Sequence, residues 1–524
     1  MRLLIPDKVR LGDGSQAESV LLDEGRVVSV GATGDLRSRA DRVEQTPGVL
    51  IPGLRDAHFH PITYAASLVV PSLKKAGSFA EIGRRLQRAA SEAPAGRPIS
   101  AIRLDDEALE EGRLPTRYDL DTMVGNQPVI VHRYCGHIAM ANTAALRLAG
   151  VTAATPDPVG GTLDRDQDGE PTGVLREMGI ETVSLPLADR TGPAVTDDQV
   201  VDAMYALASV GLTSIGGIVG CGDGPWADLG DQFSQLLRIA DRLPINVRVL
   251  VIGHDPGQLR EAARRVEEAD SRRLTFLGVK IFGDGSLGGH TAAMHEPFSD
   301  VNTTGQLRFD PVASHPLAMT ALDLGGAVAI HAIGDRANAE VLRFYRDLVT
   351  AGADADRLRI EHASVLGPAE VTAFSQLGVT ASVQPAFIAS ETEWLEKRVG
   401  KGRLKESYPL RTLLDAGVPL AGGSDCPVEP PHPLWGLAAA RDRCGLVPEE
   451  GLSAAEALAL FTTGAARALL EPPPLQPGRS ADFVVLDLDP FEASPDAIRE
   501  AAVLGTYVDG EQVEVDPGAT VWAD

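Results

Sequence analysis

The stretch from Ile51 to His60 carries two histidines, His58 and His60, in the pattern His-x-His. The apolar run before them, which starts at Gly48, predicts a buried strand, and residues i and i+2 of a strand point to the same side. Both imidazoles would then face one point at the carboxyl end of that strand, which suits a shared metal ion. By itself, the pattern also fits a surface or packed pair of histidines.

The remaining candidates for chemistry also follow apolar runs. Lys280 lies between Val279 and Ile281, and burying a lone lysine on a strand is costly unless the amine is neutralised or modified. The structural alternative is a lysine that reaches solvent from the strand end or pairs with Asp284. Three further residues end apolar segments and complete the set: His331, His362 and Asp425.

The elements that must position these residues are eight apolar segments separated mostly by helical patterns. We expect strands over 49–56, 211–217, 247–253, 277–282, 327–333, 358–362, 379–384 and 418–425, with helices over 258–269, 337–350, 368–377 and 411–416. This α/β alternation predicts a (β/α)8 TIM barrel with its chemistry at the carboxyl strand ends. An open doubly wound sheet would show the same alternation, but polar residues on six of the strands favour the barrel.

Both chain ends alternate apolar and polar residues with glycine turns, which is typical of short strands. We expect residues 1–50 and 466–524 to pair into one β-sandwich domain. The barrel then consists of residues 51–63 and 196–465.

The first two predicted strands are too far apart for a plain barrel, so residues 64–195 are expected to form an inserted domain. The pattern predicts a helix over 79–93 and a strand over 128–132, and we interpret the Gly- and Asp-rich stretch 157–173 as turns. Inserted after the first strand, this domain would overhang the site.

The composition limits the class of protein. The chain has 524 residues, of which 44% are hydrophobic and 23% charged, as is ordinary for a soluble globular protein. Its net charge of −25 argues against nucleic acid, whose phosphates it would repel. The N-terminus is too quickly polar for a signal peptide, and no apolar run approaches the ~18–20 residues of a membrane span. Four cysteines without a Cys-x-x-Cys motif indicate reduced thiols, so we expect a cytoplasmic protein with no membrane partner.

Several longer motifs resemble the amidohydrolase superfamily of metal-dependent hydrolases (amidohydrolase family 3), in the branch called YtcJ-like or N-substituted formamide deformylase-like. The resemblance covers nearly the whole chain. It rests on the segments 52–60 (PGLRDAHFH), 136–142 (GHIAMAN), 279–288 (VKIFGDGSLG), 331–336 (HAIGDR), 361–363 (EHA), 423–425 (GSD) and 481–486 (ADFVVL).

The resemblance implies a binuclear metal centre. His58 and His60 would hold one metal, and His331 and His362 the other. Lys280, carboxylated by carbon dioxide to a carbamate, would bridge them, and Asp425 would contact the first metal and the nucleophilic water. Imidazole and oxygen ligands suit zinc, and also manganese or iron.

The expected activity is hydrolysis of a C–N bond in a small amide, N-substituted formamide or N-acyl amine, with Asp425 as the proton shuttle. A cyclic amide or lactone hydrolase, a deaminase, and a non-catalytic metal-stabilised binding protein are the alternatives. His137 and Gln384 are candidate substrate contacts, although His137 also fits a structural role and Gln384 a helix cap. A homodimer is a family-level expectation.

Overall fold

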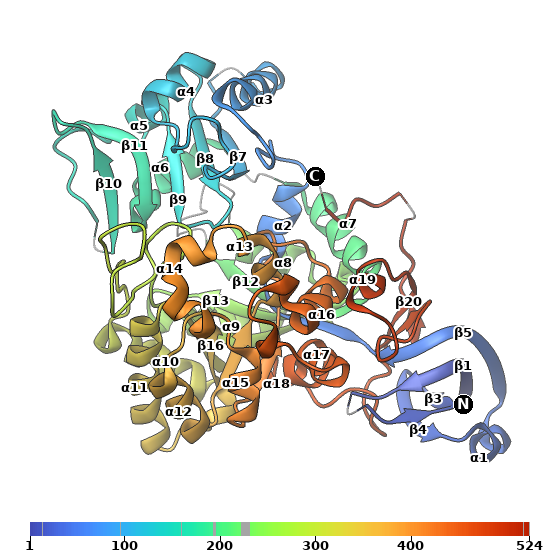
Figure 1. Cartoon of the computed structure of the whole chain (residues 1–524). Coiled ribbons are helices and arrows are strands. Elements are labelled where there is room, and N and C mark those ends of the chain that lie inside the picture. Colours follow the sequence, from blue (N-terminus) through green and yellow to red (C-terminus); the bar gives the residue numbers. More distant parts are fainter. Residues whose placement is uncertain are drawn as a thin grey trace.

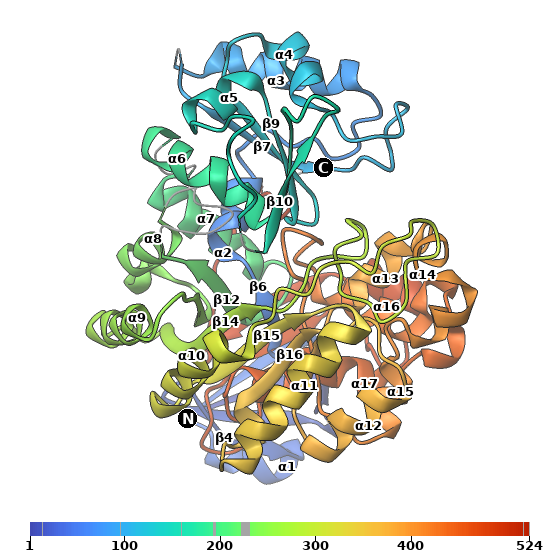
Figure 2. The same cartoon turned by 90° about the vertical axis from the view of Figure 1, so that its left-hand side faces the viewer.

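The computed structural model describes residues 1–12, 14–94, 96–158, 160–191, 195–221, 231–516 and 518–522. Its central sheet has eight parallel strands, which pair in sequence order (Figures 1 and 2). They are β6 (Leu54–Phe59), β12 (Leu212–Gly220), β13 (Asn246–Ile252), β14 (Leu274–Phe282), β15 (Ala327–Ala332), β16 (Leu358–His362), β17 (Thr380–Val383) and β18 (Leu420–Gly422).

Backbone hydrogen bonds bring the two edge strands of this sheet together. The Asp425 amide donates to the His58 carbonyl at 2.8 Å, and the His60 amide donates to the Cys426 carbonyl at 3.0 Å. All residues of β12 and β15 are buried, as expected for parallel strands covered on both faces. The predicted TIM barrel is therefore confirmed.

Helices cover the outside of the barrel (Figure 2). The four predicted ones are present as α9 (Pro256–Glu268), α11 (Asp335–Thr350), α12 (Pro368–Leu377) and α15 (Leu410–Asp415). In α11, the buried residues recur at helical spacing. The Tyr345 hydroxyl lies within hydrogen-bond distance of two backbone carbonyls, 2.9 Å from that of Val328 in β15 and 2.8 Å from that of Arg359 in β16. The other barrel helices are α2 (Pro61–Ser67), α7 (Asp197–Ala208), α8 (Gln232–Arg238), α10 (Pro311–Asp323), α13 (Pro385–Glu391), α14 (Leu395–Arg403), α16 (Pro433–Asp442), α17 (Ala454–Ala459) and α18 (Ala465–Ala468).

The first predicted strand, 49–56, is in fact two strands that meet at Gly53. Residues up to Pro52 belong to β5 (Arg42–Pro52), which lies in a different sheet from β6. A Cβ at Gly53 would lie 2.4 Å from the Thr213 hydroxyl oxygen, so only glycine lets the chain cross between the sheets here. The break leaves no sign in the apolar pattern because the residues on both sides are buried.

The two chain ends share a second sheet, as predicted. Its strand order is β21-β20-β19-β5-β1-β3-β4, with β2 paired to β1. Leucine, valine and aromatic side chains from both ends form its core, including Leu4, Leu50, Phe483 and Tyr507. The remaining bounds are β1 (Arg2–Arg10), β2 (Gln16–Ala17), β3 (Ser19–Asp23), β4 (Arg26–Gly31), α1 (Thr33–Leu36), β19 (Phe483–Leu486), α19 (Pro495–Arg499), β20 (Val503–Val508) and β21 (Glu511–Gln512).

A third sheet, of five strands, is formed by residues between β6 and β12 and lies above the barrel (Figure 2). The predicted helix and strand appear as α3 and β8, but the segment 157–173 is not only turns. It contains most of a β-hairpin, which Asp166 closes by accepting hydrogen bonds from the amides of Asp168 and Glu170. The elements are α3 (Phe79–Glu92), β7 (Ile99–Leu104), α4 (Arg117–Val124), β8 (Val129–Arg133), β9 (Ile138–Ala141), α5 (Thr143–Leu148), β10 (Gly161–Arg165), β11 (Pro171–Glu177) and α6 (Glu181–Thr191).

None of the helices in the described residues is both long and apolar enough to span a membrane.

Candidate metal centre

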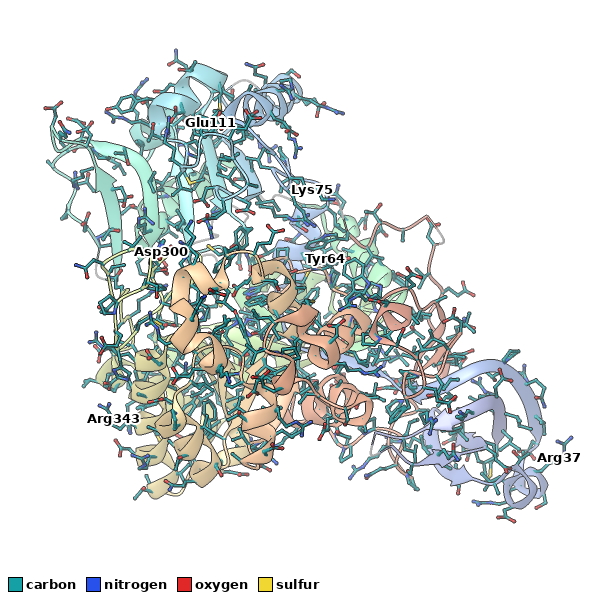
Figure 3. All side chains as sticks on the ribbon, viewed as in Figure 1. Arg37, Tyr64, Lys75, Glu111, Asp300 and Arg343 are labelled. Carbon is teal, nitrogen blue, oxygen red and sulfur yellow. The ribbon has the colours of Figure 1, made fainter. Side chains whose placement is uncertain are left out.

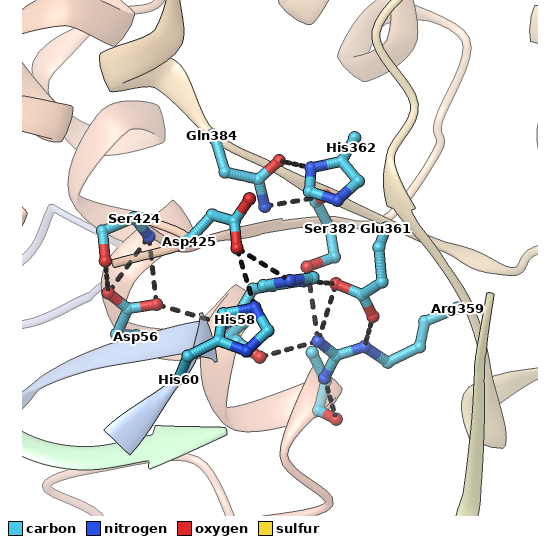
Figure 4. A network of polar contacts seen from close by, with 12 residues as sticks. Asp56, His58, His60, Arg359, Glu361, His362, Ser382, Gln384, Ser424 and Asp425 are labelled. Carbon is cyan, nitrogen blue, oxygen red and sulfur yellow. Dashed lines mark hydrogen bonds and ion pairs between the residues drawn. The ribbon is translucent and has the colours of Figure 1, made fainter. Parts of the chain in front are cut away.

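The histidine pair meets Asp425 at the carboxyl end of the barrel (Figure 4). His58 is the penultimate residue of β6, and His60 directly follows that strand. Both side chains are buried. The Asp425 Oδ1 atom lies 3.2 Å from His58 Nε2 and 3.1 Å from His60 Nε2. One ligand atom from each of the three residues falls within 4.8 Å of the others, which is close enough to hold one ion.

His331 and His362 complete a row of imidazoles across neighbouring strands. His331 is the penultimate residue of β15, and His362 is the last residue of β16. Their ring centroids are 4.5 Å apart, and the ring centroid of His362 lies 4.8 Å from that of His58. Burial holds the pKa of both side chains well below the ordinary histidine value, helped in His362 by the His331 ring. Both imidazoles are therefore neutral at pH 7, the form in which histidine binds a metal.

Hydrogen bonds behind the site fix which nitrogen of three imidazoles faces it. His58 Nδ1 donates to Glu361 at 2.5 Å, and His331 Nε2 donates to the Gly285 carbonyl at 3.0 Å. His362 Nδ1 donates to the Gln384 Oε1 atom at 2.7 Å. Because one nitrogen of each ring is a donor, the other carries a lone pair, the arrangement found in metal-bound histidines. The donor chemistry thus fits a divalent metal.

Gln384 lies behind this row. Predicted as a substrate contact, it is buried at the end of β17 and holds His362 through its side-chain oxygen. This contact gives it a role in orienting an imidazole.

Lys280 is fully buried on β14 and lines the same cavity as the histidines. Burial lowers the pKa of its amine to about 8, against the opposing effect of the Glu361 and Asp425 carboxylates. The lysine therefore does not reach solvent, and its neutral form is accessible near pH 7.

Asp284, the alternative partner of Lys280, organises the adjoining loops. Its carboxylate accepts hydrogen bonds from the backbone amides of Ala293, Ile333 and Gly334 at 2.8–3.0 Å. It also lies 3.2 Å from His331 Nε2. These contacts join the loop after β14 to the loop after β15. The second loop begins two residues after His331.

Sequence reasoning missed two buried residues behind His58. Glu361 accepts from His58 and pairs with Arg359, whose guanidinium also donates to the Ala57 carbonyl at 2.6 Å. Burial alone would raise the pKa of Glu361, but Arg359 and His58 hold it well below its usual range. The Arg-x-Glu spacing, which places both on one face of a strand, was the available signal.

Asp56 plays a similar part for Asp425. Its carboxylate accepts from the Ser424 hydroxyl at 2.5 Å and from the backbone amides of Ser424 and His58 at 3.0 Å. Asp425 itself has a φ of +57°, and such strained backbone is typical of functional sites.

The inserted sheet supplies the roof of the site. His137, predicted from sequence, lies with its ring centroid 5.1 Å from that of His331, and its Nδ1 donates to Glu177 at 2.8 Å. Residues of the barrel and of the insertion together line one cavity. Besides the metal-centre residues, its walls include Thr63, Ile102, Arg103, His132, Arg133, Tyr134, Cys135, Phe282, Pro427 and Val428.

Residues 47–514 match the model of the amidohydrolase family. The chain belongs to this family. This amidohydrolase is 32% identical to Protein LONG AFTER FAR-RED 3 of Arabidopsis thaliana, over 95% of this chain and 88% of that protein. It is 30% identical to N-substituted formamide deformylase of Arthrobacter pascens, over 97% of each. An uncharacterized metal-dependent hydrolase from Pyrococcus horikoshii OT3 matches it with a TM-score of 0.73 and 28% identity, over 94% of this chain and 99% of that one.

These matches confirm the family and the branch that the sequence motifs indicated. They also support a metal-dependent hydrolase role for this amidohydrolase.

Proposed function

We propose that this amidohydrolase uses a metal centre to hydrolyse a C–N bond in a small amide, N-substituted formamide or N-acyl amine. The observation that carries the proposal is the convergence of His58, His60 and Asp425 beside His331 and His362. These five residues come together at the carboxyl ends of the barrel strands. The name of the deformylase relative supports the choice of C–N bond. The proposed metal ligands line a cavity between the barrel and the insertion, and small-molecule sites commonly lie at such domain boundaries.

The proposed centre holds two divalent ions. Zinc is the preferred candidate, and manganese and iron are the alternatives. His58, His60 and Asp425 would hold one ion, and His331 and His362 the other. A divalent ion bound here supplies Lewis-acid polarisation of the carbonyl and lowers the pKa of a water from about 15.7 to about 7, worth roughly 12 kcal/mol at neutral pH.

Lys280 is proposed to bridge the two positions as a carbamate. The neutral amine forms an N–C bond with carbon dioxide and loses one proton, and the product offers two oxygens where the amine offers one nitrogen. With a pKa of about 8, roughly one lysine in ten is neutral at pH 7. Burial thus prepares this side chain for the modification.

Asp425 is proposed to move the proton. Burial would raise the pKa of its carboxyl, but the His58 and His60 imidazoles hold it well below the usual range, so it is ionised at neutral pH. It can accept a proton from the attacking water and pass it to the departing amine, which leaves poorly as an anion. Such acid–base help is typically ~10²–10⁴-fold, or about 3–5 kcal/mol.

A panel of matched substrates tests this function. N-substituted formamides and N-acyl amines are compared with the corresponding lactones, cyclic amides and amidines, with amine release as the readout. The proposal predicts amine release from the open-chain amides, and its loss after metal removal by a chelator. Turnover confined to lactones or to amidine deamination would contradict it, as would no turnover in the presence of zinc or manganese.

We also propose that the protein is a cytoplasmic homodimer. Cys135, Cys426 and Cys444 are free thiols, as expected in a reducing compartment. Size-exclusion chromatography with light scattering checks the oligomeric state.

A further inference from the structure

The described C-terminal segment 518–522 reaches back to the metal-centre side of the barrel. The carbonyl of Val521 accepts a hydrogen bond of 2.8 Å from the hydroxyl of Tyr64. Tyr64 belongs to α2, the helix that begins directly after His60. The segment 518–522 accordingly lies beside α2, near the junction between barrel and inserted sheet, where Figure 3 labels Tyr64 and Lys75. This segment therefore contacts the element that follows the histidine pair.

The next residue, Trp522, stacks on a cation of the inserted sheet. Its ring centroid lies 3.8 Å from the guanidinium carbon of Arg103 and 5.0 Å from the Lys74 amine. Arg103 is in β7, and the chain just before Lys74 pairs with that strand through backbone hydrogen bonds of Ile102. The tryptophan thus joins the C-terminal segment to the edge of the roof.

Arg103 lines the cavity of the metal centre and is only 4% exposed. Its φ of +66° is unusual for a strand residue and breaks the alternation of β7. A backbone of this kind persists only where its surroundings hold it.

Arg103 and the loop after β18 line the same cavity, because Pro427 and Val428 of that loop belong to its walls. Burial raises the pKa of Glu429 to about 7, while Lys74 and Arg103 favour its ionised form. Glu429 follows Asp425 in the loop after β18. Since Arg103 lines the cavity that also contains the proposed metal ligands, its guanidinium can contact a substrate held there.

We propose that Trp522 is a positioning residue that holds Arg103 in the cavity wall, where Arg103 contacts a carbonyl or carboxylate oxygen of the substrate remote from the scissile bond. A guanidinium can stack one face on an aromatic ring while its N–H groups form hydrogen bonds to such oxygens in its own plane. The stack itself stands independently, but the substrate contact rests on the proposed function.

Steady-state kinetics test the substrate contact with Trp522→Ala, Trp522→Phe, Arg103→Met and the Trp522→Ala/Arg103→Met double variant. Trp522→Ala should raise KM about 3- to 30-fold with kcat within about 2-fold. Trp522→Phe should restore most of the affinity because it keeps an aromatic face. The double variant should be no worse than Arg103→Met, since both changes remove one interaction. Additive effects, or a loss of kcat and bound metal together, would overturn the proposal.

Arginine labelling by phenylglyoxal, read by peptide mass mapping, tests the stack without any substrate. Arg103 should react faster in Trp522→Ala than in the wild type and in Trp522→Phe. Arg113, which lies 4.7 Å from the ring centroid of Phe79, serves as the internal control and should not change. If the wild type hydrolysed no amide, the proposed function would fail, and this labelling would still decide the positioning role. Equal labelling of Arg103 in all three proteins would overturn it.

Discussion

Asp425 combines a position beside both histidines with a carboxylate that stays ionised at neutral pH. Asp425→Asn keeps the shape but cannot accept a proton, so kcat should fall ~10²–10⁴-fold. The thermal midpoint should change little. Asp198→Asn, at an exposed surface aspartate, is the control and should keep wild-type kcat. Retention of activity within 10-fold in Asp425→Asn would show that another group moves the proton.

Glu361 orients His58 and neutralises Arg359 in the interior. Glu361→Gln keeps a hydrogen-bond acceptor but leaves the buried guanidinium without its counter-charge, which typically costs 3–5 kcal/mol of folding stability. Replacing the carboxylate partner of His58 by a neutral amide should also weaken metal binding about 10–100-fold. Denaturant unfolding and competition with a chromogenic chelator measure the two effects. A folded variant with unchanged metal affinity would show that Glu361 does not support metal binding.

The six proposed ligands could be predicted because each follows or interrupts an apolar run, which is a local signature. Glu361 and His58 are 303 positions apart, and their contact exists only once β6 and β16 lie in one barrel. No local pattern marks such a pair. The contact between Arg103 and Trp522 could not be predicted for the same reason, because these residues are distant in sequence and meet only in the folded protein.

At the scale of elements, β14 depends on Gly278 to place Lys280. A Cβ at Gly278 would lie 1.9 Å from the Ala327 carbonyl oxygen of β15, and its φ of +151° also disfavours other residues. Gly278→Ala should therefore destabilise the protein by about 1–3 kcal/mol and reduce activity, because the strand must shift two residues before Lys280. Gly253→Ala, whose Cβ would meet its nearest atom at 3.7 Å, is the matched control. Equal thermal midpoints in both variants would contradict this reading.

The order and type of the barrel elements followed from hydrophobic pattern, since a strand buried on both faces has a continuous apolar run. The boundary between β5 and β6 did not, because the chain passes from one buried sheet to another without a polar residue. Only the close approach of Thr213 to Gly53 marks the change of sheet.

At the scale of the molecule, Glu177 connects the inserted sheet to the barrel. It accepts from His137 and lies 2.7 Å from Arg308 of the loop after β14. Burial alone would raise its pKa, but His137 and Arg308 lower it to about 2, from an ordinary value of 4.5. Between about pH 2 and pH 4.5, this carboxylate binds a proton in the unfolded chain but not in the native protein. The stabilisation is therefore present above pH 4.5 and is lost as the pH falls toward 2.

Glu177→Gln should remove this dependence. As the pH falls from 4.5 to 3, the wild type should lose up to about 1.4 kcal/mol more stability per pH unit than the variant. At pH 7 the variant should be less stable, because His137 and Arg308 lose their partner. Urea unfolding followed across this range measures both slopes, and parallel slopes would contradict the assigned pKa of Glu177.

The metal content of the purified protein tests the proposed binuclear centre most directly. Elemental analysis would compare the wild type, Lys280→Ala and the exposed-lysine control Lys405→Ala. The proposed binuclear centre predicts about two divalent ions per chain in the wild type and in Lys405→Ala, and about one or fewer in Lys280→Ala, which lacks the bridge. A wild type that binds no metal, even after incubation with zinc or manganese, would contradict it.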